Sequence, residues 1–272
     1  MRRLLRAYFS LVRQYNLPSS VRLSGLTCVL FFHSLAPEGR TSPPSSISTT
    51  LDYVSLYLLV DTELDNPSIS YDQKRHFLLQ LLGEEADCPE VQAIRLTYNR
   101  LCPTENEQVT FLPVLLTTAE SFLVQYSTDA TLHDLLCICV NKGGHSVLAG
   151  YRLIYPSSKH PQGLRVNEHP DEQLLLLGAC IQLLDDLIDC TRDMSDGIET
   201  VATKYLRVHS CLDDLALLLG ALILQLERAL FKQRKWLLFL LVRAVGQSGH
   251  FSPGLRQRWG HARYKKYKLK DE

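Results

Sequence analysis

Four aspartates between residues 185 and 193 are the part of the sequence best suited to chemistry. Asp185, Asp186, Asp189 and Asp193 recur at spacings of three and four, and Gln182 lies one turn earlier. In a helix these residues share one face, with neighbours about 5–6 Å apart. Like charges packed this way repel one another unless cations are present. Magnesium takes oxygen ligands, commonly one or two carboxylates together with substrate phosphates, so the pattern predicts a Mg²⁺ site.

The alternative interpretation of this stripe is a solvated acidic helix face, which is what most charge runs on helices are. Three features favour the metal site: the tight phasing of the acids, the extension of the face by Gln182, and the lack of lysine at the compensating i+4 positions. Arg192 is the only base nearby in the sequence.

A second acidic element lies upstream, at the end of an apolar run that begins at Tyr57. Asp61 and Asp65 are four residues apart and share a helix face. Alone, such a pair indicates solvation of a helix end. Two carboxylate clusters facing across a bundle cavity would instead hold several metal ions around a diphosphate and assist its departure.

Helices must position these acids, because apolar residues recur at helical spacing almost throughout and strands are hard to find. We expect an all-α bundle of about eight to ten helices, with long members near 104–126, 130–155, 171–194 and 210–231. Helix starts are predicted at Thr104 with Glu107, Asp87 with Glu90, Ser210 with Asp213, Pro170 with Asp171 and Glu172, and Ser252 before Pro253. Breaks are predicted over 36–50 and 156–170.

Composition narrows the class of protein. The 272 residues, 46% hydrophobic and 21% charged, fit one globular domain spanning 1–272. Basic residues (29) balance acidic ones (29), which argues against a nucleic-acid partner. The longest apolar runs, 215–224 and 236–242, are shorter than the ~20 residues that span a bilayer, so no transmembrane segment is expected. The eight cysteines lack a CxxC pair and are interpreted mostly as buried thiols.

The N-terminus carries five arginines before the first acid, Glu38. This is the charge bias of a transit peptide and also of a basic amphipathic helix. We interpret it as a structural helix of a cytoplasmic protein, with mitochondrial targeting as the alternative.

The acidic stripe resembles a known family motif. Gly178, Gln182, Asp185, Asp186 and Asp189 match the second aspartate-rich motif of trans-prenyltransferases in residue type and spacing. The chain is thereby similar to the class I isoprenoid synthase superfamily. The stretch from Lys142 through Gly143, Gly144 and His145 to Gly150 is similar to the lysine and small-residue element that precedes this motif in bacterial-type class I proteins.

The chain also departs from the family pattern. The first motif is usually Asp-Asp-x-x-Asp, whereas here Asp61-Thr-Glu-Leu-Asp65 keeps only the outer acids. The prenyltransferase Arg-Arg pair has a displaced counterpart in Lys74 and Arg75, and a Gly-Lys element is missing. The second motif of terpene synthases is not cleanly present either. The sequence thus lies between the two subfamilies.

The resemblance implies an all-α bundle with a central cavity in which Mg²⁺ binds an allylic prenyl diphosphate, and diphosphate leaves to give a carbocation. It implies metal ligands at Asp61, Asp65, Asp185, Asp186 and Asp189, of which Asp61, Asp185 and Asp186 are the catalytic acids. It also implies diphosphate contacts from Lys142, Gln182, Arg192, Arg263 and Tyr264. Tyr53, Tyr57 and Tyr151 could stabilise the cation through their faces, or be ordinary core.

Three functions remain open at this point. A terpene synthase acting on one allylic diphosphate is preferred, because the first motif is altered and the Gly-Lys element is missing. A trans-prenyltransferase and a non-catalytic helical partner of an isoprenoid synthase are the alternatives. The basic tail 256–266 could also touch anionic membranes, and the apolar segment 215–226 could pack within the bundle or across a homodimer.

Overall fold

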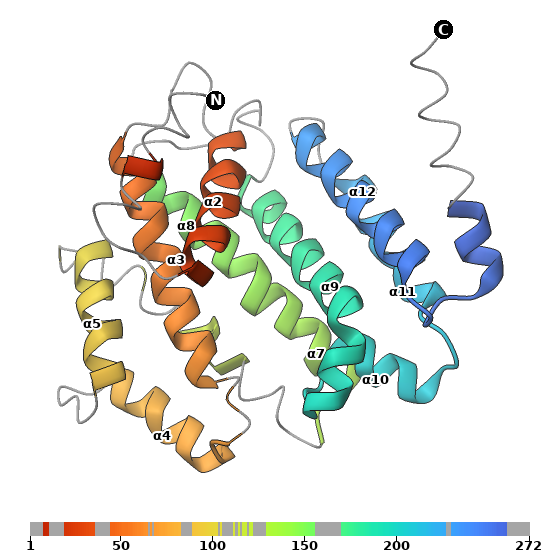
Figure 1. Cartoon of the computed structure of the whole chain (residues 1–272), viewed down its shortest axis with the longest axis horizontal. Helices are drawn as coiled ribbons and strands as arrows, with labels where there is room; N and C mark the ends of the chain where they lie inside the picture. Colours follow the sequence, from red (N-terminus) through yellow and green to blue (C-terminus); the bar gives the residue numbers. More distant parts are fainter. Residues whose placement is uncertain are drawn as a thin grey trace, which may run out of the picture. The chain divides into compact units, whose positions relative to one another are not determined.

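The protein folds into α-helices, as a computed structural model shows (Figure 1). The structure describes residues 8–10, 19–35, 44–64, 66, 68–82, 89–102, 104, single residues and short stretches within 111–121, and then 129–155, 170–226 and 230–259. No strand occurs in these ranges. The predicted all-α class is confirmed.

The helices with defined bounds follow one another along the chain. They are α2 Ser19–Ser34, α3 Pro44–Leu64, α4 Tyr71–Leu82, α5 Pro89–Leu101, α7 Leu132–Ile138, the π-helix η1 Cys139–Gly144, α8 His145–Ile154, α9 Pro170–Asp196, α10 Val201–Val208, α11 Asp213–Gln225 and α12 Phe231–Gln247. A further short helix covers 253–259.

The chain divides into two compact units. The first comprises Met1–Leu123 with His145–Asp171, and the second comprises Val124–Gly144 with Glu172–Glu272. The acidic stripe lies in the second unit and the Asp61 element in the first. That the whole chain forms one bundle around a central cavity stays a prediction.

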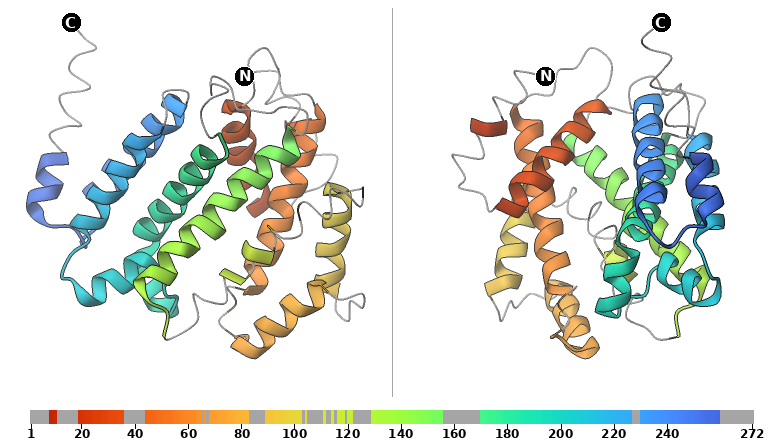
Figure 2. Two further views of the ribbon diagram at one scale, coloured as in Figure 1. Left: turned by 180° about the vertical axis from the view of Figure 1, so that it is seen from behind. Right: turned by 45° about the vertical axis from the view of Figure 1, so that its right-hand side comes forward.

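In the first unit, α3 is the central helix. It packs against α2, α5 and α8 (Figure 2). One core cluster joins Tyr8 to Val29 of α2 and to Ile47 and Leu51 of α3, all nearly inaccessible to solvent. Burial of this apolar surface, at about 25 cal/mol per Å², is what holds the helices together.

Aromatic side chains fill the space between α2, α3 and α8. Phe32 and Tyr53 meet edge to face, with ring centroids 6.2 Å apart. An added Cβ at Gly150 would lie 2.5 Å from the Phe32 ring, so only glycine lets α8 approach so closely. The Tyr53 hydroxyl donates to the Ser146 carbonyl at 2.7 Å. Tyr53 is therefore a packed, hydrogen-bonded core residue.

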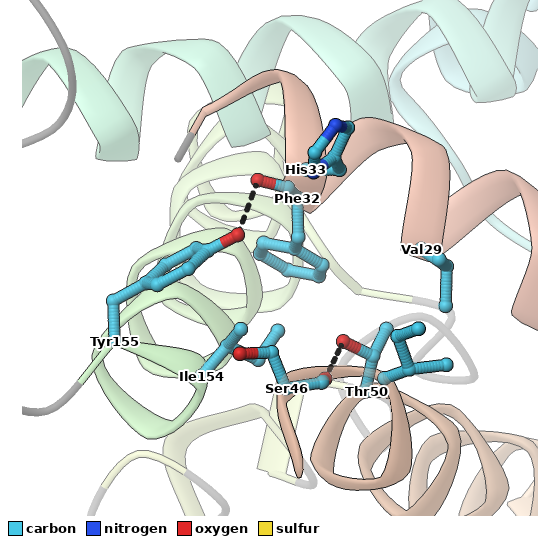
Figure 3. A pocket seen from close by; sticks show the side chains of 8 residues that line it. Val29, Phe32, His33, Ser46, Thr50, Ile154 and Tyr155 are labelled. Atoms are coloured by element: carbon cyan, nitrogen blue, oxygen red, sulfur yellow. Dashed lines mark hydrogen bonds between the residues drawn. The ribbon is translucent and has the colours of Figure 1, made fainter. Parts of the chain in front are cut away.

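The cavities described in this unit are small. One of them measures about 10 Å³. Among its lining residues, drawn in Figure 3, the Tyr155 hydroxyl donates to the Phe32 carbonyl at 3.1 Å and the Thr50 hydroxyl donates to the Ser46 carbonyl. Another, beside Tyr53 and Tyr57, measures about 20 Å³. A single water needs about 10–15 Å³, so each cavity has room for about one water and no larger molecule.

In the second unit, α9 is the longest helix. Proline at its first position suits a helix start, as the sequence predicts. Gly197 ends it with a φ of +72°, a conformation that favours glycine. There the Ile198 N–H donates to the Asp193 carbonyl at 2.9 Å. α10 packs against α7, and α11 packs against α12.

Several predicted helix boundaries are wrong. The expected helix 210–231 is α11, which ends at Gln225 because Leu226 has extended backbone angles. Leu212, rather than Ser210, lies at its N-cap, and Asp213 accepts hydrogen bonds from Ser252. The predicted break over 36–50 is too long, because α3 already begins at Pro44.

Two other predicted helix positions are confirmed, and two lie largely outside the described residues. The helix near 130–155 is present as α7, η1 and α8, although its π-helical turn was not expected. Ser252 caps the final turn, because its hydroxyl accepts the Leu255 N–H at 3.2 Å. Most of 104–126, including Glu107, and the Asp87 start signal lie outside the described residues.

Over the described residues, no helix combines the length and apolarity needed to cross a membrane.

Candidate functional site

The predicted acidic face exists on α9, and its members differ in exposure. Asp185 is exposed and Asp189 is half-buried, whereas Asp186 and Asp193 are 4% and 5% exposed. The half-buried Gln182 lies one turn earlier. The helix thus carries carboxylates from the solvent into the interior of the second unit.

Asp186 is the most connected residue of this face. One of its oxygens, Oδ1, accepts from the Gln182 side-chain amide at 2.9 Å. The other, Oδ2, accepts from the main-chain N–H of Val201 at 3.3 Å and lies 4.0 Å from the Cys139 sulfur. A single carboxylate therefore joins α9 to the first turn of α10 and to η1.

Burial and mutual repulsion disturb the ionisation of two of the acids. Burial, with a smaller contribution from Asp185, raises the pKa of Asp186 to about 6, although its hydrogen bonds and the Lys142 ammonium act against this rise. Burial, with the charges of Asp186 and Asp189, raises the pKa of Asp193 to about 7. Both effects penalise the charged form of a carboxyl group. A bound cation would remove much of this penalty.

Arg192 partly neutralises the C-terminal part of the face, at Asp189 and Asp193. Its guanidinium donates to Asp189 at 2.6 Å and lies 3.9 Å from Asp193. Its side chain is two-thirds exposed, so the pair with Asp189 contributes about 0–1 kcal/mol to stability. The guanidinium of an exposed arginine can leave its carboxylate partners and bind a phosphate group instead, because its paired N–H donors fit phosphate oxygens as well as carboxylate oxygens.

Lys142 lies in η1 and approaches the face from the buried side. It is 9% exposed and acts electrostatically on both Asp186 and Cys139. Such π-helical turns occur frequently at functional sites. The structure therefore brings Lys142, Gln182 and Arg192 to the acidic face, and their contact with a diphosphate stays a prediction.

The start of α10 contacts the buried Asp186 of the face. Thr200 caps this helix in a reciprocal pair with Thr203. Glu199, next to the cap and 6% exposed, forms ion pairs with Arg207 and, at 3.9 Å, with Lys204. The free N–H groups of a helix start favour negative charge, which suits the carboxylate of Asp186.

The donor set of the face fits magnesium in its chemistry. Asp185 and Asp189 offer carboxylate oxygens one turn apart on the accessible part of the face. Among the described residues, no group of three or more His, Cys, Asp or Glu side chains stands in a metal-site arrangement. Protein carboxylates commonly supply only one or two of the ligands of Mg²⁺ and substrate phosphates supply others, so two accessible aspartates suffice for the fit.

The other predicted site residues are not placed at this face. The backbone of Asp61 lies in the last turn of α3, in the first unit, and its side chain is outside the described residues. Asp65, Arg263 and Tyr264 are outside them altogether. That the two acidic elements face each other stays a prediction.

Sequence reasoning missed two parts of the site. The sequence predicts a buried thiol at Cys139, as found, but not its contact with Asp186; burial and this carboxylate raise the pKa of the thiol strongly. The helix α10 was not expected, yet Thr200 and Thr203 at a three-residue offset are a start signal of the kind used elsewhere in the chain. Gly197 just before this signal also marks the end of α9.

A larger cavity in the second unit lies on a different side of α9. It measures about 530 Å³ and is lined by Leu187, Ile188 and Thr191 of α9, by residues of α12 and by Ser248 and Gly249. Helical periodicity places these three α9 residues away from the centre of the acidic face. The cavity is therefore separate from the carboxylates.

No protein-family model, curated protein or solved structure matches this chain significantly.

Proposed function

We propose that this protein is a Mg²⁺-dependent class I terpene synthase that ionises an allylic prenyl diphosphate and releases diphosphate. The observation that carries the proposal is the acidic face of α9, on which four aspartates lie within about two turns beside a buried lysine. Burial, with a smaller contribution from repulsion between the acids, raises the pKa of Asp186 and Asp193, and the motif resembles that of the family.

Asp185 and Asp189 are the accessible carboxylates that would hold Mg²⁺. The bound metal would stabilise the negative charge that develops on the departing diphosphate. Asp186 contributes its charge and holds Gln182 toward the same face through their 2.9 Å hydrogen bond. In this proposal the acids bind metal and do not transfer protons.

The cationic side chains supply the remaining contacts to the diphosphate. Arg192 reaches the face from the solvent side and Lys142 from the buried side. Hydrogen bonds from such cations to phosphate oxygens are worth about 1.5–3 kcal/mol each. They bind the leaving group most strongly as its charge grows, which lowers the barrier to ionisation.

A non-catalytic helical partner of an isoprenoid synthase is the second candidate. It is favoured by the internal contacts of the acids, because Asp186 accepts from Gln182 and Val201 while Asp189 accepts from Arg192. These contacts satisfy the two acids without a metal. The altered first motif, with Asp61 and Asp65 but no second aspartate, points the same way.

Product analysis distinguishes these functions. Purified protein is incubated with Mg²⁺ and allylic diphosphates of increasing chain length, each with and without isopentenyl diphosphate. A hydrocarbon or alcohol formed from the allylic substrate alone supports the synthase. Products formed only with both substrates would make the protein a trans-prenyltransferase, the family alternative. No product and no Mg²⁺-dependent binding of any diphosphate would favour the non-catalytic partner.

Two variants test whether product formation depends on the acidic face itself rather than on a general effect of replacing an exposed aspartate. Asp185→Asn removes an exposed ligand and should abolish product formation. Asp129→Asn changes another exposed acid, in the turn before α7 and outside the acidic face, and should leave product formation at the wild-type level.

A further inference from the structure

The π-helix η1 and the helix α9 touch backbone to backbone. An added Cβ at Gly178 would lie 2.2 Å from the carbonyl oxygen of Gly143, and one at Gly143 would lie 2.4 Å from the carbonyl oxygen of Gly178. Real Cβ atoms essentially never approach other atoms within 3.0 Å. Any side chain at either position would therefore push the two helices apart.

This contact lies next to the acidic face. A Cβ at Gly143 would also meet the Cβ of Gln182 at 2.7 Å, and the Cys139 sulfur at the other end of η1 lies 4.0 Å from the Asp186 carboxylate. Lys142, between them in the sequence, is buried although lysine is rarely buried unless it is paired. The separation of the two helices thus decides how close the Lys142 ammonium comes to the carboxylates.

We propose that Gly143 and Gly178 are positioning residues, whose backbone contact sets the spacing of η1 and α9 and so holds the Lys142 ammonium at the acidic face. The inference deepens the proposed function and rests on it for the role of Lys142 toward diphosphate. The close approach also explains why glycine occupies both positions of the family-like motifs, because it leaves no room for a side chain.

The first test needs no diphosphate. Wild-type protein and Gly178→Ala are treated with an amine-acetylating reagent, and mass spectrometry follows modification of Lys142, with the exposed Lys235 as an internal reference. We expect Lys142 to react several-fold more slowly than Lys235 in the wild type and to become several-fold more reactive in Gly178→Ala. Equal protection of Lys142 in both folded proteins would overturn the proposal.

A matched control measures how a new methyl group on a helix affects Lys142 reactivity when it causes no steric contact. Gly246 in α12 has no atom within 4 Å of an added Cβ, so Gly246→Ala should leave the reactivity of Lys142 unchanged. If Gly178→Ala does not fold, Gly144→Ala replaces it, because its Cβ would meet the Leu175 carbonyl oxygen at the less severe distance of 2.9 Å. A rise in reactivity equal to that in Gly246→Ala would overturn the proposal.

The second test asks whether Gly178 acts through Lys142. Calorimetry measures the Mg²⁺-dependent binding of inorganic pyrophosphate to the wild type, Gly178→Ala, Lys142→Met and the double variant. Loss of one charged contact should weaken binding about tenfold. The double variant should bind no more weakly than Lys142→Met, since residues that act through one contact are not additive. Fully additive losses would overturn the proposal.

The two tests separate failure of the inference from failure of the proposed function. A wild type that binds no pyrophosphate with Mg²⁺ contradicts the proposed function, and the acetylation result alone then decides the positioning role. A wild type that binds pyrophosphate, with Lys142 equally protected in Gly178→Ala, keeps the proposed function and overturns the inference.

Discussion

The carboxylate of Asp186 accepts the main-chain N–H of Val201 at 3.3 Å, so a side chain in the middle of α9 binds the first turn of α10. The same carboxylate accepts from Gln182 and lies near η1. Asp186 thus connects three helical elements of the second unit, besides belonging to the proposed metal site.

Truncation of Asp186 should therefore cost stability. Asp186→Ala leaves the buried Val201 N–H without its acceptor, and we expect a loss of about 1–3 kcal/mol in the free energy of unfolding. Asp186→Asn keeps an acceptor and removes the penalised charge, so it should lie within about 1 kcal/mol of the wild type. Urea unfolding measures both. Equal stabilities of the two variants would show that the contact with α10 contributes nothing.

Stability should depend on pH through Asp193. Its pKa is about 7 in the folded protein, against an ordinary value of 3.8 that applies to the unfolded chain. Between these two pH values the folded state therefore binds more protons than the unfolded state. The contribution of this group to the free energy of unfolding is then largest below pH 4 and falls as the pH rises toward 7. Asp186, with a pKa of about 6, acts in the same direction.

Substitution of Asp193 by its neutral isostere tests this dependence. With a chelator present, Asp193→Asn should be more stable than the wild type at pH 7.5, on the order of 2 kcal/mol, and the difference should shrink at pH 4.5. Urea unfolding at the two pH values measures it, with Asp129→Asn as the control. A difference that is the same at both pH values would contradict the raised pKa.

Two neighbouring cysteines should differ in reactivity. Cys137 is exposed, whereas Cys139 is buried against Asp186, which raises its thiol pKa. Because the thiolate is the reactive form, iodoacetamide at pH 8 should modify Cys137 rapidly and Cys139 only after unfolding. Mass spectrometry of the peptide containing both sites gives the two rates. Similar rates in the folded protein would show that η1 is not packed on α9.

The helix α9 could be predicted from the sequence because its signals are local. Pro170 begins it, apolar residues recur at helical spacing, and the acids fall on one face by spacing alone. The burial of Asp186 and Asp193 could not be predicted in this way. Asp186 is buried against the first turn of α10, a short helix that follows α9 after the turn at Gly197.

The close contact of Gly143 with Gly178 was also beyond prediction. The two glycines are far apart in the sequence, and nothing local indicates that they meet. The π-helical turn at η1 was missed because apolar periodicity does not register one wider turn within a long helix. The end of α11 at Gln225 was missed because neither glycine nor proline marks it.

Binding of Mn²⁺, which also prefers oxygen ligands, tests whether the acidic face of α9 is a metal site. Electron paramagnetic resonance counts the free ion during titration of the protein in the presence of inorganic pyrophosphate. We predict saturable binding by the wild type and by Asp129→Asn, and a loss of at least tenfold in affinity in Asp185→Asn and Asp189→Asn. Equal affinity in all four proteins, or no binding by the wild type, would contradict a metal-dependent function at this face.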